Sequence, residues 1–340
     1  MDIRSETDLE ERLSRPLEAD VAAMKALEGD LLVLGAGGKM GPSLVRRARR
    51  AVQAAGSGTR VIAVARFSEA GLEQSLREEG VETVGCDLLE DGALSRLPDA
   101  QNVIFMAARK FGTSGAAHLT WAMNTYLPGL VAERYRSSRI VAFSSGNVYP
   151  LVPVTSGGAT ESSSTAPVGE YAQSVLGRER MFEWGSDRWQ TPVCLLRLNY
   201  AVDLRYGVLM DIGRAVFEQR PVDVRMGLVN VIWQGDANSY CLRALAHCAS
   251  PPRILNITGP ETLSVEYVAR EFGKRFRLEP QFSGEPGGTA LLNNAAETHS
   301  LFGYPTVTAS EMIEWAAAWI ASGGRSLNKP TKFQVRDGRF

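Results

Sequence analysis

The sequence predicts an α/β protein with a doubly wound parallel sheet and a smaller C-terminal substrate domain. Short apolar runs alternate with helical patterns from residue 31 to about residue 200. These runs contain few polar residues, which is typical of parallel strands covered by helices on both faces. A glycine-rich turn follows the first run, as it does where the first strand of such a sheet leads into a phosphate-binding helix.

The elements follow in a simple order along the chain. Residues 1–30 predict a helical extension, because charged residues alternate with spaced Leu, Val and Met up to Gly29. We assign residues 31–200 to a dinucleotide-binding domain, to which segments near 229–258 return. The less regular pattern over 201–340 predicts a domain that mostly binds substrate. The predicted strands are residues 31–35, 60–65, 81–85, 102–107, 139–144 and 192–198.

The composition excludes several classes of partner. The net charge is −1, so no overall field attracts nucleic acid or a membrane surface. No apolar run approaches the roughly 20 residues that span a bilayer. The cysteines lack C-x-x-C spacing and the histidines are isolated, so we expect no metal site. The first residues lack the apolar core of a signal peptide. We therefore expect a cytoplasmic protein with a small-molecule substrate, and a homodimer is left open.

The stretch "LLVLGAGGKMGPSLVRR" has the pattern of a strand, a glycine turn and a helix. Glycine permits a tight turn and lets backbone N–H groups approach a pyrophosphate at the positive helix N-terminus. The alternative, a simple tight turn, leaves the adjacent Gly37 and Gly38 without a reason. The turn therefore predicts a Rossmann-type cofactor site. Its predicted contacts are Gly35, Gly38, Lys39, Met40 and Gly41.

The second predicted strand indicates which dinucleotide binds. An acidic residue at its end would favour NAD, but Arg66 stands there, and Lys39 lies in the glycine turn. Two cations suit a 2′-phosphate, so we expect NADP, with NAD left open. A solvated Arg66 at the strand end is the competing interpretation. Asp87 and Leu88, after the third strand, are placed to flank the adenine.

Several segments, in this order along residues 31–260, resemble the extended short-chain dehydrogenase/reductase superfamily, in particular its NAD-dependent epimerase/dehydratase branch. They are "GAGGKMG", "CDL", "FMAA", "FSSGNVY", "EYAQSV" and "LRLN". The resemblance implies a nicotinamide cofactor and an oxidoreductase that acts on a sugar or sugar-nucleotide-like substrate. It also implies that Ala107 and Ala108 of "FMAA" contact the cofactor.

The resemblance assigns the reactive groups to Ser145 and Tyr171. Ser145 lies four residues before Tyr149 in "SSGNVYP", where Pro150 replaces the usual glycine. Tyr171 opens "YAQSV" in the place of the catalytic tyrosine. The partner lysine of the family maps onto Val175, so the chain departs from the standard pattern at this position.

The missing lysine requires a replacement cation if Tyr171 is to act as a base. A free tyrosine has a pKa near 10, and a depression of about 3 units, or ~4 kcal/mol, is needed near neutrality. A cation about 4 Å away supplies roughly that much. Lys110, just past the fourth strand, is the best-placed lysine. Arg178 is a second candidate because i and i+7 share a helix face, although an arginine on an exposed face is usually only solvated.

Other positions carry weaker expectations. The resemblance places Asn147, Asn199 and Tyr200 where substrate is bound, and a strand-end polar pair is an equally good interpretation of the last two. Asn124 matches a position that holds the active-site backbone, with a surface amide as its alternative. Two alternatives for the whole protein stay open: a non-catalytic NADP(H)-binding regulator, and a redox-neutral lyase or isomerase that retains its cofactor.

Overall fold

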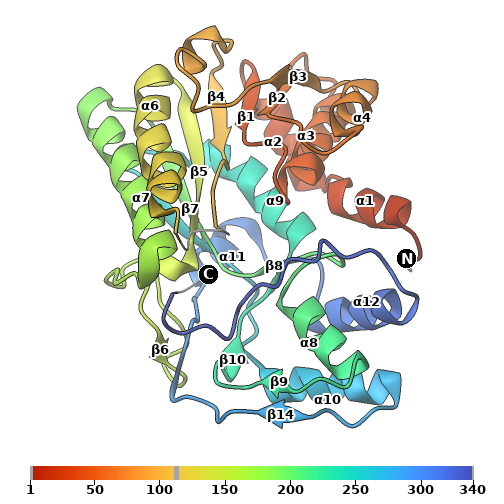
Figure 1. The fold of residues 1–340 in the computed structure, drawn as a ribbon. Coiled ribbons are helices and arrows are strands. Elements are labelled where there is room, and N and C mark those ends of the chain that lie inside the picture. The colour runs from red at the N-terminus through yellow and green to blue at the C-terminus, as the bar shows by residue number, and fades with distance from the viewer. Residues whose placement is uncertain (1–2, 111–114, 339–340) are drawn as a thin grey trace.

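A seven-stranded parallel sheet forms the centre of the computed structural model, which describes residues 3–110 and 115–338 (Figure 1). The strand order is β12-β7-β5-β4-β1-β2-β3, and each neighbouring pair is parallel. The strands are β1 (Leu31–Leu34), β2 (Val61–Ala65), β3 (Glu82–Gly85), β4 (Asn102–Phe105), β5 (Arg139–Ser145), β7 (Val193–Leu198) and β12 (Arg253–Ile257). Every predicted strand is present, β12 comes from the predicted return segment, and the predicted fold class is confirmed.

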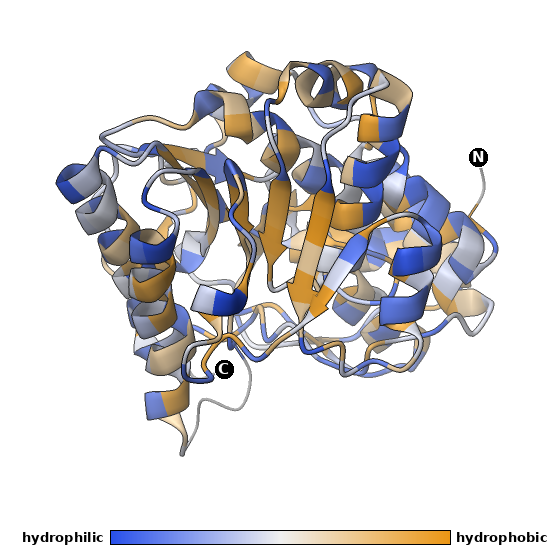
Figure 2. Cartoon of the chain, turned by 90° about the horizontal axis from the view of Figure 1, so that it is seen from above, coloured by the Kyte–Doolittle hydropathy of each residue, from blue (hydrophilic) through white to orange (hydrophobic). Residues whose placement is uncertain are grey.

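Apolar side chains cover both faces of the sheet, as Figure 2 shows by the orange strands between two layers of helices. In β1, Leu31 and Val33 pack into one core cluster and Leu32 and Leu34 into another. Successive side chains of a strand point to opposite faces, so a continuous apolar run is needed when both faces are covered. Helices α3 (Gly41–Ala55) and α9 (Gln234–Ala244) cover the first face, and α6 (Leu127–Arg134) and α7 (Gly169–Trp189) cover the second.

The first residues of the chain form two helices, α1 (Glu6–Ser14) and α2 (Glu18–Ala26), and both contact α3. A buried ion pair joins α2 to α3, with Arg47 Nε 2.7 Å from an Asp20 carboxylate oxygen. The amphipathic pattern of the extension therefore reflects packing onto the helix that follows the glycine turn.

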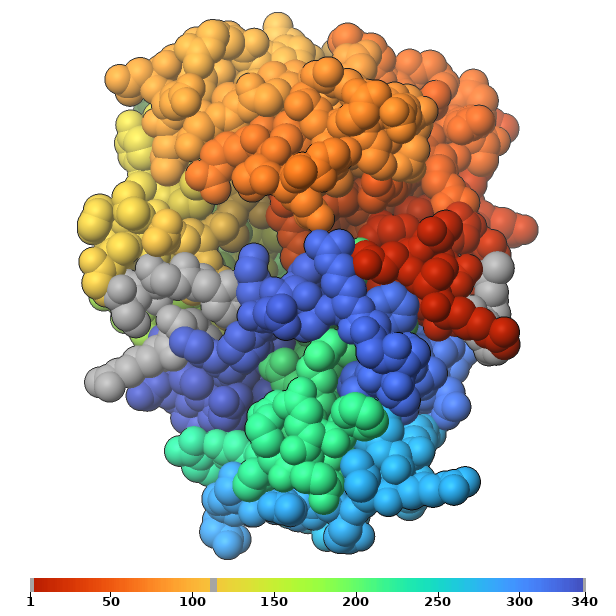
Figure 3. Space-filling model, turned by 45° about the vertical axis from the view of Figure 1, so that its right-hand side comes forward, coloured from red at the N-terminus to blue at the C-terminus, as the bar shows by residue number. Residues whose placement is uncertain are grey.

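The residues after 200 build a second apolar core around helices α8 (Val208–Phe217), α10 (Val265–Phe276) and α12 (Ala309–Ala321). The last described residues run along this core, and Phe333 belongs to it. Thr331 donates its backbone N–H and hydroxyl to Asp211 at 2.7 and 2.6 Å. Figure 3 shows this C-terminal segment in dark blue, lying between the first half of the chain and the green α8. The domain boundary near residue 200 stays a prediction.

The remaining elements are short. The helices are α4 (Leu72–Glu78), α5 (Ala117–Trp121) and α11 (Ala296–Phe302), with single turns at Leu94–Arg96, Ala122–Tyr126, Gly146–Val148 and Leu245–His247. The two-residue strands are β6 (Val152–Pro153), β8 (Ala201–Val202), β9 (Val222–Asp223), β10 (Leu228–Val229), β11 (Ile232–Trp233), β13 (Leu263–Ser264), β14 (Phe282–Ser283) and β15 (Thr289–Ala290). Within the described ranges, no helix has the length and apolar character that crossing a membrane requires.

Candidate active site

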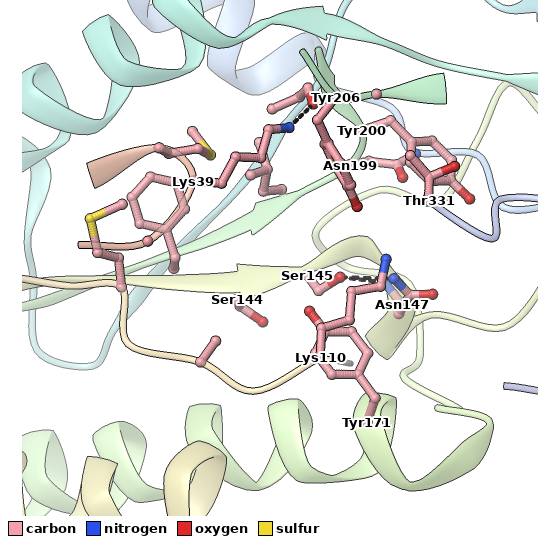
Figure 4. A pocket seen from close by; sticks show the side chains of 18 of the residues that line it. Lys39, Lys110, Ser144, Ser145, Asn147, Tyr171, Asn199, Tyr200, Tyr206 and Thr331 are labelled. Atoms are coloured by element: carbon pink, nitrogen blue, oxygen red, sulfur yellow. Dashed lines mark hydrogen bonds between the residues drawn. The ribbon is translucent and has the colours of Figure 1, made fainter. Parts of the chain in front are cut away.

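A cavity of about 280 Å³ lies where the carboxyl ends of the central strands meet the C-terminal half of the chain (Figure 4). Ligands of open parallel sheets bind at this edge, beside the point where the strand order reverses. Here that point lies between β1 and β4. The glycine turn, the ends of β5 and β7, the first turn of α7 and residues 198–208 line the cavity.

Ser145 and Tyr171 meet inside this cavity. Ser145 ends β5, and Tyr171 lies in the first turn of α7 with its hydroxyl directed toward Ser145 (Figure 4). The two hydroxyl groups face each other (Figure 4), and the interaction with Ser145 acts to lower the pKa of Tyr171. Asn147 donates to Ser145 Oγ twice, from its backbone nitrogen at 3.2 Å and from Nδ2 at 3.0 Å. The structure therefore brings together the pair that the resemblance assigned, although 26 residues separate them in sequence.

Burial raises the pKa of Tyr171 above its ordinary value, while the charge of Arg178 and the hydrogen bond from Ser145 act in the opposite direction. The ordinary value is near 10, so Tyr171 is protonated at neutral pH in the protein without ligands. In that state its phenol can donate a proton to a substrate oxygen.

Val175 occupies the position of the family's lysine as part of the core. It is 1% exposed and packs in a small apolar cluster with Val148, Tyr149 and Ala159, against which Tyr171 also lies. No cation of α7 is therefore available four residues after Tyr171.

Lys110 lies over the face of the Tyr171 ring, with Nζ 5.7 Å from the ring centroid. Burial lowers the pKa of Lys110 to about 8. The predicted approach of Lys110 to Tyr171 is thus present, but the ammonium faces the ring. Whether Lys110 replaces the missing lysine stays a prediction.

Arg178 was the second candidate for the replacement cation, and the alternative, an arginine solvated on an exposed helix face, is wrong. Its side chain is 2% exposed, and it lines the same cavity as Tyr171. The sequence contains a signal for this burial. The residues three and four positions away on the helix are uncharged (Ser174, Val175, Met181 and Phe182), so this face of α7 carries no partner that would hold an arginine in solvent.

Asn124 fixes the backbone of the loop that carries Lys110. Its Oδ1 accepts from Arg109 N at 2.9 Å, and its Nδ2 donates to Arg109 O and to Ser174 Oγ, both at 3.0 Å. Asn124 is fully buried, so the alternative of a surface amide is wrong.

The glycine turn has the shape of a phosphate-binding site. Gly35 has φ +92°, and a Cβ there would lie 2.5 Å from Ala107 N. A Cβ on Gly41 would lie 2.2 Å from Ala36 O. A Cβ on Gly38 would meet only Gly35 O at 3.5 Å, so Gly38 borders open space.

Backbone donors at the same turn lack acceptors. The N–H groups of Lys39 and Met40 donate to no oxygen of the described residues, and they precede the 15-residue helix α3. Free N–H groups at a helix N-terminus favour an anion. The turn therefore fits the pyrophosphate of a dinucleotide.

A second cavity, of about 190 Å³, continues from the glycine turn past the ends of β2 and β3. Arg66 lines it with a 68% exposed side chain, and its guanidinium lies 3.7 Å from the Asp87 carboxylate. Leu88, Ala107 and Ala108 line the same cavity. The positions predicted to surround the adenosine and the adjoining cofactor are thus gathered at one site.

Lys39 does not lie beside Arg66, so the expectation of two cations at one 2′-phosphate is wrong for Lys39. Its Nζ donates to Ala201 O at 2.8 Å and lies 3.9 Å from the Tyr206 ring centroid. The side chain is directed from the turn into the first cavity (Figure 4). Burial lowers the pKa of Lys39 to about 7. Lys39 therefore lies at the end of the turn that faces the cavity of Ser145 and Tyr171.

Asn199 and Tyr200 line the cavity beyond β7, as predicted. Asn199 Nδ2 donates to Leu291 O at 3.4 Å, and Tyr200 has a φ of +46°. Tyr206 and Thr331 also line the cavity, and sequence reasoning did not find them. Neither residue lies in a sequence motif. The bend after β8 brings Tyr206 to the cavity, and the C-terminal segment brings Thr331 there.

The comparisons with known proteins agree with this geometry. The model of the NAD dependent epimerase/dehydratase family matches residues 31–202. The chain belongs to this family. A search of curated proteins found no relative.

Solved structures of epimerases and dehydratases share the fold. The UDP-glucuronic acid 4-epimerase of Bacillus cereus, solved with NAD, has a TM-score of 0.71 at 18% identity, over 86% of this chain and 99% of that one. The dTDP-glucose 4,6-dehydratase of Bacillus anthracis, also with NAD, has a TM-score of 0.72 at 15% identity, over 86% and 96%. The UDP-glucose 4-epimerase of Thermotoga maritima, solved with UDP-glucose, has a TM-score of 0.71 at 14% identity, over 86% and 99%.

The buried Lys39 predicts proton uptake when a dinucleotide binds. A pyrophosphate at the turn favours the charged ammonium, so binding at about pH 8 should raise the Lys39 pKa and take a proton from the buffer. Titration calorimetry in buffers of different ionisation enthalpy measures this uptake. Lys39→Met should reduce it, and equal uptake by both proteins would contradict the assignment.

The lowered pKa of Lys39 also makes the folding stability of the ligand-free protein depend on pH. The pKa is lowered from 10.5 unfolded to about 7 folded, so burying the ammonium costs most below pH 7 and the cost disappears toward pH 10.5. Lys39→Met should therefore raise the melting temperature most in acid solution, with the gain shrinking as the pH rises.

Proposed function

We propose that this protein is an NAD(P)-dependent oxidoreductase of the epimerase/dehydratase type that acts on a sugar or sugar-nucleotide-like substrate. The observation that carries the proposal is that Ser145 and Tyr171 line one cavity adjoining the glycine turn, with the Tyr171 hydroxyl directed toward Ser145 (Figure 4). A proton donor beside a hydride acceptor is what reversible oxidation of an alcohol carbon requires.

In this proposal Ser145, Asn147 and Tyr171 have different roles in catalysis. When bound, a nicotinamide ring supplies hydride transfer to or from a substrate carbon. Ser145 holds the substrate oxygen, and the two Asn147 donors fix the Ser145 hydroxyl. Tyr171 gives its phenolic proton to that oxygen when a carbonyl is reduced, and takes the proton back when the alcohol is oxidised.

The substrate class rests on the family and on the space available. Two of the similar solved structures contain UDP-glucose, one of them together with NAD. In this chain the cavity beyond the catalytic pair is lined by amide and hydroxyl groups of Asn147, Asn199, Tyr206 and Thr331. Such groups suit the hydroxyls of a sugar.

The proposal is tested by identifying what the protein binds and converts. Nucleotide released by denaturing the purified protein is identified by mass spectrometry. The protein is then incubated with UDP- and dTDP-hexoses, and the products are resolved by proton NMR. We expect a bound nicotinamide dinucleotide and conversion of at least one sugar nucleotide that is lost in Tyr171→Phe. Dinucleotide binding without conversion of any sugar nucleotide or free polyol would overturn the enzymatic proposal in favour of a cofactor-binding regulator.

The cofactor preference should depend on Arg66 alone. We expect NADP(H) to bind more tightly than NAD(H), because Arg66 is exposed at the adenosine end and can turn from Asp87 to a 2′-phosphate. Arg66→Ala should lower the NADP(H) affinity about tenfold or more and leave the NAD(H) affinity nearly unchanged. Calorimetric titration with each cofactor measures this.

Lys39→Met is the matched control for the cofactor preference, since Lys39 lies at the other end of the turn. It should change both affinities in the same proportion. A preference for NAD(H) in the wild-type protein would show that Arg66 does not select the phosphate.

A further inference from the structure

Arg178 is a buried cation with an unusual set of partners. Its Nη1 donates to Phe143 O at 2.6 Å, and its Nη2 donates to Ala107 O and Asn124 Oδ1, both at 3.1 Å. Its Nε lies 3.5 Å from Asn124 O. These acceptors belong to the end of β5, the residue pair just past β4, and the turn before α6. The guanidinium thus ties α7 to both strands that border the cavity.

All these acceptors are neutral. Among the residues that the structure describes, no carboxylate forms an ion pair with Arg178, and the adjacent Glu179 is paired with Arg197 at 2.7 Å. Burying a guanidinium without a counter-ion is costly: burial lowers the pKa of Arg178, which is about 10 although Tyr171 and Glu179 act in the opposite direction. The hydrogen bonds fix the position of the guanidinium, and its positive charge is left without a paired carboxylate among the described residues.

The geometry directs this charge toward Tyr171. Residues seven apart lie on one face of a helix, and helical side chains lean toward the N-terminus, so Arg178 reaches back toward the turn that holds Tyr171. Both side chains line the same cavity. Val175 lies between them on this face and is apolar and buried.

We propose that Arg178 is a positioning residue that replaces the cation missing at Val175, by holding a fixed positive charge beside Tyr171 and by tying α7 to the ends of β4 and β5. The inference deepens the proposed function, because it rests on Tyr171 being the group that exchanges the proton. In this proposal the role of the family's lysine is taken by an arginine that lies one helix turn after position 175.

The charges around Tyr171 support this assignment. The groups that face it are Arg178 from its own helix, Lys110 from the loop after β4, and Tyr206 from the bend after β8. Arg178 lowers the pKa of Tyr171, and Tyr171 in turn raises the pKa of Arg178. Lys110 faces the ring, and its own charge is weakened by burial.

The test follows the ionisation of Tyr171 directly and needs no substrate. A difluorotyrosine at position 171 is more acidic than tyrosine, and its ¹⁹F shift is followed against pH. Arg178→Met should raise the apparent pKa of this group by about 1–2 units, and Arg178→Lys by less, because it keeps the charge. Arg180→Met, an exposed arginine paired with Glu183 on the same helix, is the matched control and should leave the titration unchanged. An unchanged titration in folded Arg178→Met, or a larger shift in Lys110→Met, would overturn the proposal.

A second variant tests whether a cation at the family position can take the place of Arg178. Val175→Lys restores a cation at the family position, so the double variant Val175→Lys/Arg178→Met should return the titration to within about half a unit of the wild-type value. A double variant that folds but keeps the raised pKa would count against Arg178 as the missing cation. If the titration shifts as expected while no sugar nucleotide is converted, the proposed function fails and the inference about Arg178 stands.

Discussion

Tyr171→Phe should lower kcat by about 10²–10⁴-fold on the substrate that the protein converts, with little change in cofactor affinity. The phenol lies beside Ser145 within the cavity, where it can reach a substrate oxygen that Ser145 holds (Figure 4). Phenylalanine keeps the ring that Lys110 faces, so the packing of the site is preserved. Single-turnover kinetics at saturating substrate measures the loss.

Ser145→Ala is the companion to this variant. Because Ser145 binds the substrate oxygen while Tyr171 moves the proton, we expect a smaller loss of kcat and a larger rise of KM. Full activity of Tyr171→Phe would leave the tyrosine without a chemical role and would remove the basis of the proposed mechanism.

Gly38→Val should abolish dinucleotide binding, with a loss of affinity of more than about 100-fold, while the protein still folds. The added Cβ meets only Gly35 O at 3.5 Å, which is ordinary contact, and Gly38 does not have a positive φ. The valine methyls instead fill the open space beside the N-terminus of α3, where the pyrophosphate is expected. Fluorescence titration with NADPH and a thermal melt measure the two effects.

Two glycines of the same turn provide the contrast. Gly41→Val should fail to fold or lose much of its stability, because its Cβ would lie 2.2 Å from a backbone oxygen. Gly35→Val is strained as well, with φ +92° and the Ala107 backbone 2.5 Å from the new Cβ. A folded Gly38→Val that binds NADPH as tightly as the wild type would show that the turn has only a structural role.

The sheet is the part of this protein that follows most directly from local sequence. Except for the edge strand β3, which is exposed or half-buried, the predicted strands are apolar runs buried between two layers of helices. The glycine turn could also be predicted from the sequence. Its conformation requires glycine at positions 35 and 41, where the close approaches leave no room for a side chain. Ser145 and Tyr171 could be paired through family motifs, and the structure places them in contact.

The directions of the charged side chains depended on tertiary structure. Lys39 and Arg66 looked equivalent in sequence, but the bend at residues 201–206 gives Lys39 an oxygen acceptor and a ring inside the cavity. Thr331 reaches the site only because Asp211 holds the C-terminal segment across it. The helix alone left Arg178 open as either a cation near Tyr171 or a solvated residue. The carbonyl groups that bury it come from Phe143, Ala107 and Asn124, between 35 and 71 residues away along the chain. Helix periodicity shows which face a residue occupies, but the acceptors that meet that face are supplied by distant segments, and they decide whether a cation there is solvated or held beside Tyr171.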